Sequence, residues 1–313
     1  MAKSAFDDPR FNDEAAAFAY VESKLWPNGP VCPHCGNADP NRIRKMGGKT
    51  TRLGLHACYE CKGQFTVRQG TIFESSHLPL NLWLQVIHLM CASKKGVSTR
   101  QIQRMLSCSM KTAWFLTHRI RKAMRSGSLS PMGGAGSVVE VDETFIGRKD
   151  GEEIRRGAWH KNTVLTLVER GGEARSFHVE SVNKADVLPV VRANLVRESH
   201  VVTDEAARYA QLGNEFAKHS AVDHSREEYG YRDRESGVNI NTNSVEGYFS
   251  VFKRGMIGVY QQCSEQHLHR YLAEFDFRYS YRIRTGYDDA ARAERALLGV
   301  KGKRLTYETT SAH

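Results

Sequence analysis

Residues 137–146 read SVVEVDETFI, and this run predicts a β-strand with a carboxylate inside it. Val138, Val139 and Val141 favour a strand, because β-branched side chains pack well on a pleated sheet. Asp142 follows directly, in a position where an ionised carboxylate is costly unless it binds a metal or pairs with a cation. The run therefore predicts both a strand and a site residue.

The sequence changes character around this strand. Residues 126–128 and 133–137 are rich in Gly and Ser and form the clearest linker in the chain. Apolar residues recur at helical spacing before the linker and at strand spacing after it. After 137–146 we expect a hairpin at 163–169 and 173–179, a helix at 184–196, a strand at 200–203, a helix at 205–212, a strand at 217–223, and helices at 243–254 and 266–279. This order predicts a mixed sheet covered by helices.

Further acidic residues stand at the ends of these elements. Asp204 follows the apolar run 201–203 and so ends a strand, and Glu246 lies in the first turn of a helix. Lys253 comes seven residues, or two turns, after Glu246 and lies on the same helix face. Two strand aspartates, a helix glutamate and a lysine suit two divalent ions about 3.5–4 Å apart, which polarise the attacking and leaving oxygens of a phosphodiester.

Each of these residues also has a structural interpretation. Asn243 with Glu246 matches a capping box. Asp204 can cap the helix after it, and Asp142 can pair with an arginine. Any one residue alone is better explained by its structural role, whereas the set, beside a DNA-binding segment, favours catalysis.

Positive charge is concentrated in one segment. No Asp or Glu occurs from Ser75 to Val139, and nine Lys or Arg residues there supply nearly the whole net charge of +10. A surface of one sign attracts a polyanion, because each neutralised phosphate releases counterions. Nucleic acid is the expected partner, and a solvated basic face without a partner is the alternative.

The same segment has the spacing of a helix-turn-helix. Helices are expected at 80–90, 99–106 and 110–124, with Ser98 and Ser109 as N-caps of the last two. The last helix would direct its N-terminal residues to base edges, whereas a plain three-helix packing unit is the alternative. The side chains expected at DNA are Lys94, Lys95, Arg100, Arg104, Lys111, Thr112, His118, Arg119 and Lys122.

Four of the seven cysteines are spaced for zinc. Cys32 and Cys35 form one C-x2-C pair, Cys58 and Cys61 form another, and 22 residues separate the pairs. Each pair presents two thiolates to one tetrahedral ion, and a set of four leaves no open position for substrate. Thiols stay reduced in the cytosol, so we interpret these cysteines as metal ligands and not as disulfides. The pattern therefore predicts a zinc ribbon with a structural zinc.

Composition argues against a membrane protein. The 313 residues have a mean hydropathy of -0.51, and no run approaches the roughly 18–20 apolar residues of a spanning helix. The N-terminal residues lack the apolar core of a signal peptide. We therefore expect a cytosolic protein. Separately, the spacing of apolar residues predicts a short helix over 11–24.

Together these motifs resemble a bacterial insertion-sequence transposase. The similar group carries an N-terminal zinc ribbon and an RNase H-like catalytic domain, and it is insertion sequence family fifteen ninety-five. The resemblance covers about residues 20–285. The segments that carry it are Cys32-Pro33-His34-Cys35-Gly36, Thr71-Ile72-Phe73, Val141-Asp142-Glu143-Thr144, Thr203-Asp204, Asn243-Ser244-Val245-Glu246-Gly247, Lys253-Arg254-Gly255, His267-Leu268-His269-Arg270-Tyr271 and Glu274-Phe275-Asp276-Phe277-Arg278-Tyr279.

The resemblance implies a DDE-type enzyme. Asp142, Asp204 and Glu246 would hold two Mg²⁺ or Mn²⁺ ions, and the basic residue beyond the third acid is Lys253. Arg254 would join it at the DNA phosphates. Members of this group are described with Asn in place of the third acid, so Asn243 is the alternative, alone or with Glu246. The spacing to Lys253 favours Glu246.

The resemblance also implies a reaction and its partners. The protein would bind the terminal inverted repeats of its element, hydrolyse a phosphodiester at each end, and direct the freed 3′-OH at target DNA. Because two DNA ends must meet, we expect a homodimer or larger assembly on double-stranded DNA, in the bacterial cytoplasm at the nucleoid and away from membranes.

The expected fold is multi-domain α+β, with a zinc ribbon, a helix-turn-helix and an RNase H-like mixed α/β domain. The expected divisions are an N-terminal helix at 1–27, the zinc ribbon at 28–75, the helix-turn-helix at 76–127, a linker at 128–137, the catalytic domain at 138–285 and a C-terminal tail at 286–313.

Two other functions compete with this one. His267 and His269 with Tyr271 match the His-hydrophobe-His and tyrosine set of single-strand nucleases, but two histidines two residues apart diverge by about 200° on the helix expected there. The other competitor is a non-catalytic or domesticated DNA-binding regulator, which would need no matched carboxylates.

Overall fold

The computed structural model describes residues 4–127, 130–204, 207–222, 230–234 and 236–305, which divide into two compact units. The first unit takes its described residues from 1–93, 97–125 and 289–313. The second takes its described residues from 94–96 and 126–288. The expected linker at 128–137 thus lies just after the first boundary, and the C-terminal residues return to the first unit.

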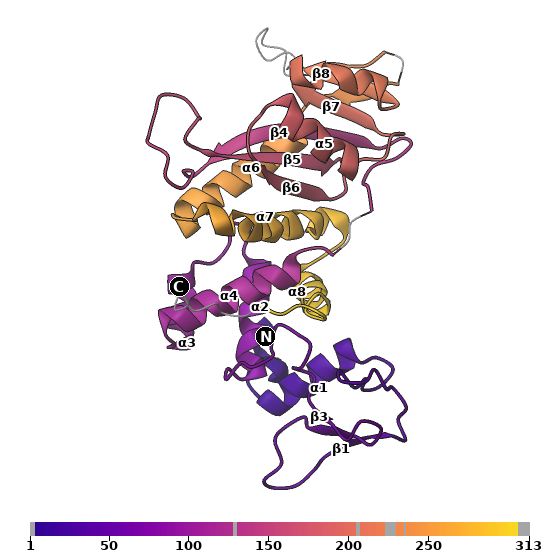
Figure 1. The fold of residues 1–313 in the computed structure, drawn as a ribbon, viewed down its shortest axis with the longest axis vertical. Coiled ribbons are helices and arrows are strands. Elements are labelled where there is room, and N and C mark those ends of the chain that lie inside the picture. Colours follow the sequence, from indigo (N-terminus) through magenta and orange to yellow (C-terminus); the bar gives the residue numbers. More distant parts are fainter. Residues whose placement is uncertain (1–3, 128–129, 205–206, 223–229, 235, 306–313) are drawn as a thin grey trace. The chain divides into compact units, whose positions relative to one another are not determined.

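The second unit is built on a five-stranded sheet (Figure 1). Its middle strand is β4 (Val138–Ile146), the strand predicted from the opening motif. Strands β4, β5 and β6 pair antiparallel, whereas β7 pairs parallel with β4 and β8 parallel with β7. Across the sheet the order is β6 (Ala174–Val179), β5 (Asn162–Glu169), β4, β7 (His200–Asp204) and β8 (Lys218–Val222). The predicted mixed sheet is confirmed.

Helices cover both faces of this sheet (Figure 1). On one face, Val139 and Val141 pack with α5 (Lys184–Asn194) and with the 3-10 helix Ala207–Asn214. On the other face, Val164 and Val168 pack with α6 (Asn243–Gly255) and α7 (Glu265–Ser280). Because side chains alternate along a strand, Glu140, Asp142 and Ile146 point toward the α6 face.

Smaller elements complete the second unit. A short hairpin of β9 (Tyr231–Arg232) and β10 (Asn239–Ile240) precedes α6. A π-helical turn, Met256–Tyr260, follows α6 directly, and a 3-10 turn, Ile283–Thr285, follows α7. The helix expected at 205–212 is seen as the 3-10 helix from residue 207, and its residues 205–206 lie outside the described residues, as does residue 223 of the strand expected at 217–223.

The first unit joins helices to a small three-stranded sheet. Its described helices are two 3-10 turns (Ala5–Asp7 and Pro9–Phe11), α1 (Glu14–Leu25), α2 (Leu80–Ala92), α3 (Thr99–Leu106), α4 (Met110–Met124) and α8 (Asp289–Leu298). Antiparallel strands β1 (Ile43–Lys45), β2 (His56–Cys58) and β3 (Gln64–Phe65) form the sheet. The bounds predicted for α3 and α4 are confirmed.

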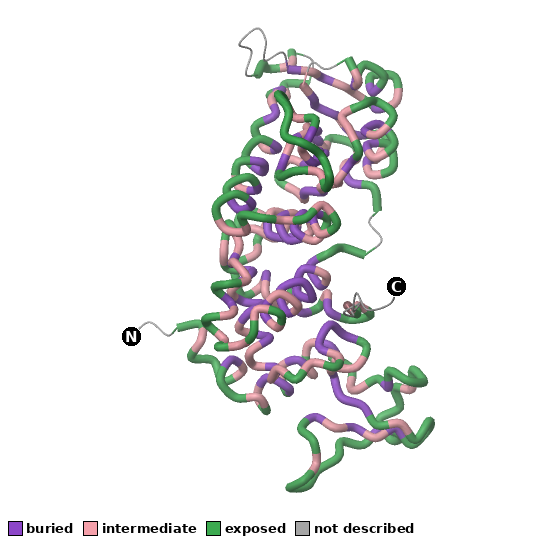
Figure 2. Tube along the Cα trace, turned by 60° about the vertical axis from the view of Figure 1, so that its left-hand side comes forward, coloured by how far each residue is buried: buried purple, intermediate pink, exposed green. Residues whose placement is uncertain are grey.

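Helix α8 was not predicted, because residues 286–313 were expected to form a tail. It packs against α2, and the guanidinium of Arg292 donates a 2.7 Å hydrogen bond to the carbonyl of Cys91. Within the described residues, no helix is both long and apolar enough to cross a membrane. Buried residues follow the helices and strands, whereas residues 28–64 are mostly exposed (Figure 2).

Candidate active site and metal centre

Asp142 and Asp204 lie level with each other on neighbouring parallel strands. The register pairs Glu140 of β4 with Val202 of β7, so two further residues along each strand bring Asp142 beside Asp204. Both carboxylates stand where β7 ends, at an edge that is open to approach: the Asp204 side chain is 34% exposed. The fold thus brings together two acids that are 62 positions apart (204 minus 142) in sequence.

The electrostatics of Asp142 show which other acids are near. Burial raises the pKa of this carboxyl to about 7, although the N–H of Glu143 donates to it at 2.7 Å. The charges of Glu143, Asp204 and Glu246 add to the rise. The charges of three neighbouring carboxylates therefore raise the energy of the charged form of Asp142 unless a cation lies near it.

Asp204 has one oxygen committed and one free for a ligand. Its Oδ2 lies 3.5 Å from Nη2 of Arg208, whereas its Oδ1 is buried and accepts no hydrogen bond from the described residues. A buried carboxylate oxygen without a donor is costly. A cation at this position would satisfy it, so the donor set fits a divalent metal.

Helix α6 carries the third acid. Glu246 and Asn243 are both exposed, and the hydroxyl of Thr242 donates to Oε1 of Glu246 at 2.7 Å. The predicted alternative of an Asn243 capping box is not what the structure has: Thr242 is the N-cap residue, and its side chain makes no capping hydrogen bond. Lys253 and Arg254 are exposed in the last turn of α6.

Two further acids of β4 went unnoticed in the sequence. Glu140 is fully buried and accepts hydrogen bonds from the backbone N–H groups of Ser244 and Val245, at 2.7 and 2.9 Å. Glu143 points to the opposite face, where Arg208 binds it through two nitrogens at 2.8 and 2.9 Å. An acid at every second position of an apolar strand was the available signal for Glu140.

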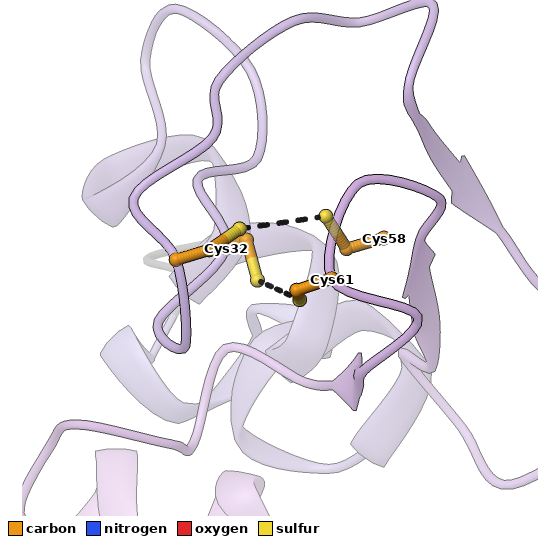
Figure 3. Close-up of side chains that lie close together, drawn as sticks. Cys32, Cys58 and Cys61 are labelled. Atoms are coloured by element: carbon orange, nitrogen blue, oxygen red, sulfur yellow. Dashed lines mark hydrogen bonds between the residues drawn. The ribbon is translucent and has the colours of Figure 1, made fainter.

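The four predicted cysteine ligands come together in the first unit. The sulfurs of Cys32 and Cys61 are 3.7 Å apart, and so are those of Cys35 and Cys58. In the close-up, the labelled side chains of the two C-x2-C pairs turn toward one another (Figure 3). Among the described residues, this is the only group of three or more Cys, His, Asp or Glu side chains whose ligand atoms all lie within 4.8 Å of one another. Asp142, Asp204 and Glu246 do not meet this criterion, so the ligand atoms of at least one pair of them are more than 4.8 Å apart.

The thiols are arranged for a metal rather than for one another. Backbone N–H groups of Cys61 and Glu60 lower the pKa of the Cys58 thiol to about 6. Although the N–H of Asn37 lowers the pKa of Cys35, burial and the neighbouring thiols raise it to about 12. Four thiolates therefore cannot all carry charge here without a dication, which is the role of zinc in such a cluster.

Two domain families match the chain, and together they span well over half of it. Residues 133–280 match the ISXO2-like transposase domain, and residues 12–64 match the transposase zinc-ribbon domain. The chain belongs to the transposases of insertion sequence family fifteen ninety-five. It is also 24% identical over 285 residues to a Halobacterium salinarum protein described as an uncharacterized protein in transposable element ISH50, covering 86% of this chain and 91% of that protein.

This membership gives the matched segments their context. The zinc-ribbon match contains all four cysteines, and the transposase-domain match contains Asp142, Asp204, Asn243, Glu246 and Lys253. DNA is therefore the partner that both domain types imply.

The basic helices separate into exposed and buried cations. Ser98 and Ser109 cap α3 and α4 as predicted, accepting from Gln101 and Thr112 at 3.2 and 3.1 Å. The exposed residues expected at DNA are Lys94, Lys95, Arg100, Arg104 and Lys111, while Thr112 and Lys122 are half-buried.

Arg119 and His118 face inward instead. The guanidinium of Arg119 donates to the carbonyls of Ile72 and Glu74, both at 2.8 Å. His118 is fully buried against the ring of Trp114, with ring centroids 4.1 Å apart. Arg119 thus ties α4 to the carbonyls of residues 72 and 74, and both side chains are packed inside the first unit, where DNA does not reach them.

The competing nuclease motif falls on α7. Residues 265–280 form a helix, so His267 and His269 diverge, and Tyr271 is buried with its ring 4.8 Å from that of Tyr260. This arrangement gives no shared site for two histidines and a tyrosine nucleophile.

Proposed function

We propose that this protein is an active transposase that cleaves the ends of its insertion sequence and joins them to target DNA. The observation that supports the proposal is that Asp204 and Glu246 lie near enough to Asp142 for their charges to raise its pKa, on two parallel strands and the helix packed over them in the matched transposase domain. The chemistry follows from what these residues can hold and from the cations beside them.

The three carboxylates would hold two Mg²⁺ or Mn²⁺ ions. Support comes from the buried, unpartnered Oδ1 of Asp204 and from the raised pKa of Asp142, both of which a cation would relieve. When bound, such ions polarise the attacking and leaving oxygens of a phosphodiester. Asn243 lies three residues before Glu246 on the same helix and is the alternative ligand, through its neutral amide oxygen.

The chain's own residues would position the DNA. Strands β4 and β7 fix the two aspartates on a rigid frame, which suits a reaction that depends on alignment. Lys253 and Arg254 are exposed two turns beyond Glu246 and would hold phosphates beside the scissile bond. The carboxylates would serve as metal ligands and not as nucleophiles, so water and then the 3′-OH would attack the phosphorus directly.

The basic helices would recognise the element's ends. The first turn of helix α4 carries the exposed Lys111 and the half-buried Thr112, at the end that a recognition helix directs into the major groove. Arg100 and Arg104 on α3 would contact the phosphates. Lys94 and Lys95 belong to the second unit and would add phosphate contacts there. We propose that the cysteine cluster binds zinc, which stabilises the first unit.

Two DNA ends must be held at once, so the active form would be a homodimer or larger assembly on double-stranded DNA. A cytoplasmic protein bound at the nucleoid fits these partners. Both statements follow from the reaction and belong to the proposal.

The test is cleavage at the element's own ends. Purified protein, Mg²⁺ and a labelled duplex carrying a terminal repeat should give a free 3′-OH at the repeat boundary. Asp142→Asn should bind the duplex equally and cleave roughly 10³-fold more slowly or not at all. The exposed Asp150→Asn is the matched control and should cleave at the wild-type rate. End binding without cleavage by the wild type would identify a regulator instead.

A further inference from the structure

Glu140 is a buried carboxylate that joins the central strand to the helix of the third acid. It has no measurable exposure, and its Oε2 accepts from the N–H groups of Ser244 and Val245. Its Oε1 accepts from Nε of Arg170 at 2.6 Å. Each oxygen is therefore matched by a strong donor, which is what a buried charge requires.

Helix α6 depends on this contact because its N-cap residue makes no capping hydrogen bond, and the nearby Oδ1 of Asn241 accepts only from the N–H of Asn243, at 3.2 Å. The N–H groups in the first turn of a helix need acceptors from outside the helix. Thr242 at the N-cap supplies none, since its hydroxyl is turned to Glu246. A carboxylate at this end is also favoured by the helix dipole. Glu140 supplies the cap from 104 residues away in sequence.

Arg170 fixes the chain just before the helix. Besides Glu140, its guanidinium donates to the backbone carbonyls of Asn239 and Asn241, the latter at 2.7 Å. It also reaches Oδ1 of Asn241 at 3.3 Å. The start of α6 is thus tied to β4 by one carboxylate and to the turn after β5 by one guanidinium.

We propose that Glu140 and Arg170 are positioning residues that set where Glu246 stands relative to Asp142. Glu140 and Asp142 share one face of β4, about 6.7 Å apart along the strand. Glu246 follows the two capped N–H groups directly. A metal site needs its ligands held within about 0.5 Å of their positions. The cap fixes α6, which carries Glu246, relative to β4, which carries Asp142. The inference rests on the proposed function, because it takes Glu246 as the third ligand.

A second polar contact on α6 provides the matched control. The hydroxyl of Tyr248 donates to Asp276 at 2.7 Å, the N–H of Ser176 donates to the same carboxylate at 2.8 Å, and the Ser176 hydroxyl lies 2.8 Å from that of Tyr248. This cluster holds the middle of α6 to α7 and β6 and leaves the first turn alone. Tyr248→Phe therefore weakens the same helix without touching its cap.

Two measurements test the proposal in the full-length protein. Amide hydrogen exchange at Ser244 and Val245 reports the cap, and electron paramagnetic resonance of Mn²⁺ reports metal binding without any reaction. Glu140→Gln keeps the side-chain volume but loses the charge. It should speed exchange at both amides about tenfold, the effect of losing a helix cap, and weaken Mn²⁺ binding by about 10–100-fold, as for other residues that orient a metal ligand.

Arg170→Met provides a second route to the same answer. Its side chain is 23% exposed, so it can be replaced even if Glu140→Gln fails to fold. It should weaken Mn²⁺ binding in the same direction. Tyr248→Phe should lower the melting temperature while leaving Mn²⁺ affinity and the two amides as in the wild type.

The outcomes separate this inference from the proposed function. If Glu246→Gln weakens Mn²⁺ binding while Glu140→Gln and Arg170→Met bind it like the wild type, the positioning role is wrong and the metal site stands. If Glu246→Gln binds Mn²⁺ like the wild type, the third-ligand assignment is wrong, and the positioning role falls with it. Unchanged exchange in Glu140→Gln would show that the cap itself is not needed.

Discussion

Burial changes individual carboxylates most clearly at Asp276. Its packing between α6, α7 and β6 raises the pKa to about 7, against the lowering effect of hydrogen bonds from Tyr248 and Ser176. Because the folded-state pKa lies above the unfolded one, the folded protein binds more protons between about pH 4 and pH 7. The contribution of Asp276 to stability is therefore greatest in acid and is lost as the pH rises through 7.

This sign leads to a measurable pH dependence. Between pH 5 and pH 8, Asp276→Asn should gain about 2 kcal/mol in free energy of unfolding relative to the wild type. Urea unfolding of both proteins at the two pH values gives the difference. The exposed Asp150→Asn should follow the wild type. An Asp276→Asn variant that also parallels the wild type would show that this carboxyl does not titrate as stated.

The third ligand can be decided by comparing two residues of α6. We expect Glu246→Gln to lower end cleavage by roughly 10²–10³-fold, because it removes a charged ligand. Asn243→Ala should cost about tenfold or less, because the neutral amide can be replaced by water. Single-turnover cleavage rates at fixed Mg²⁺ provide the comparison. The reverse order of effects would make Asn243 the ligand.

The sequence predicted the acids that stand out in apolar runs. It did not reveal residues whose role depends on partners far away in the chain. Asp142 and Asp204 are visible because each interrupts or ends an apolar run. The partners of Glu140 are 30, 104 and 105 residues away, and Arg208 is 65 residues from Glu143, so no local pattern reveals them. Arg119 was misplaced for the same reason, since its carbonyl partners lie 45 and 47 residues back.

At the level of elements, local signals predicted α3 and α4 well. Both begin after a serine whose hydroxyl accepts from the third residue beyond it, and α3 ends at Ser107 in the left-handed region, with φ of 48°. Helix α8 was missed because its identity depends on α2, about 200 residues earlier, which its buried Leu297 and Arg292 cover. A helix cap can be predicted from neighbouring residues, whereas the face on which a helix packs depends on distant ones.

The zinc ribbon yields a prediction about metal removal. Its core is small, with Cys32, Ile43, Cys58 and Phe65 packed together, so the metal must supply much of its folding energy. Cys58→Ser or a strong chelator should release zinc and open residues 28–64 to protease, while the second unit keeps its melting transition. Zinc content and limited proteolysis check this. Cys263→Ser is the control and should retain one zinc per chain. Protease resistance after complete zinc loss would contradict the account.

At the scale of the whole molecule, charge should govern DNA binding. The exposed cations of α3 and α4 predict affinity that falls steeply with salt, with a slope that decreases by about 0.9 for each phosphate contact removed. Arg104→Gln should reduce that slope and leave stability unchanged. Arg119→Gln should instead lower the melting temperature, because it leaves two buried carbonyls unbonded. Fluorescence anisotropy across salt concentrations separates the two, and equal slopes for wild type and Arg104→Gln would remove Arg104 from the interface.

In the proposed reaction, one carboxylate site acts on both water and a DNA 3′-OH. The most direct test is joining of pre-cleaved element ends to a target plasmid in Mg²⁺, which bypasses the hydrolysis step. The wild type should give joined products, and Asp204→Asn should give none while still binding the ends and melting at a similar temperature. Joining by Asp204→Asn at the wild-type rate would contradict the account.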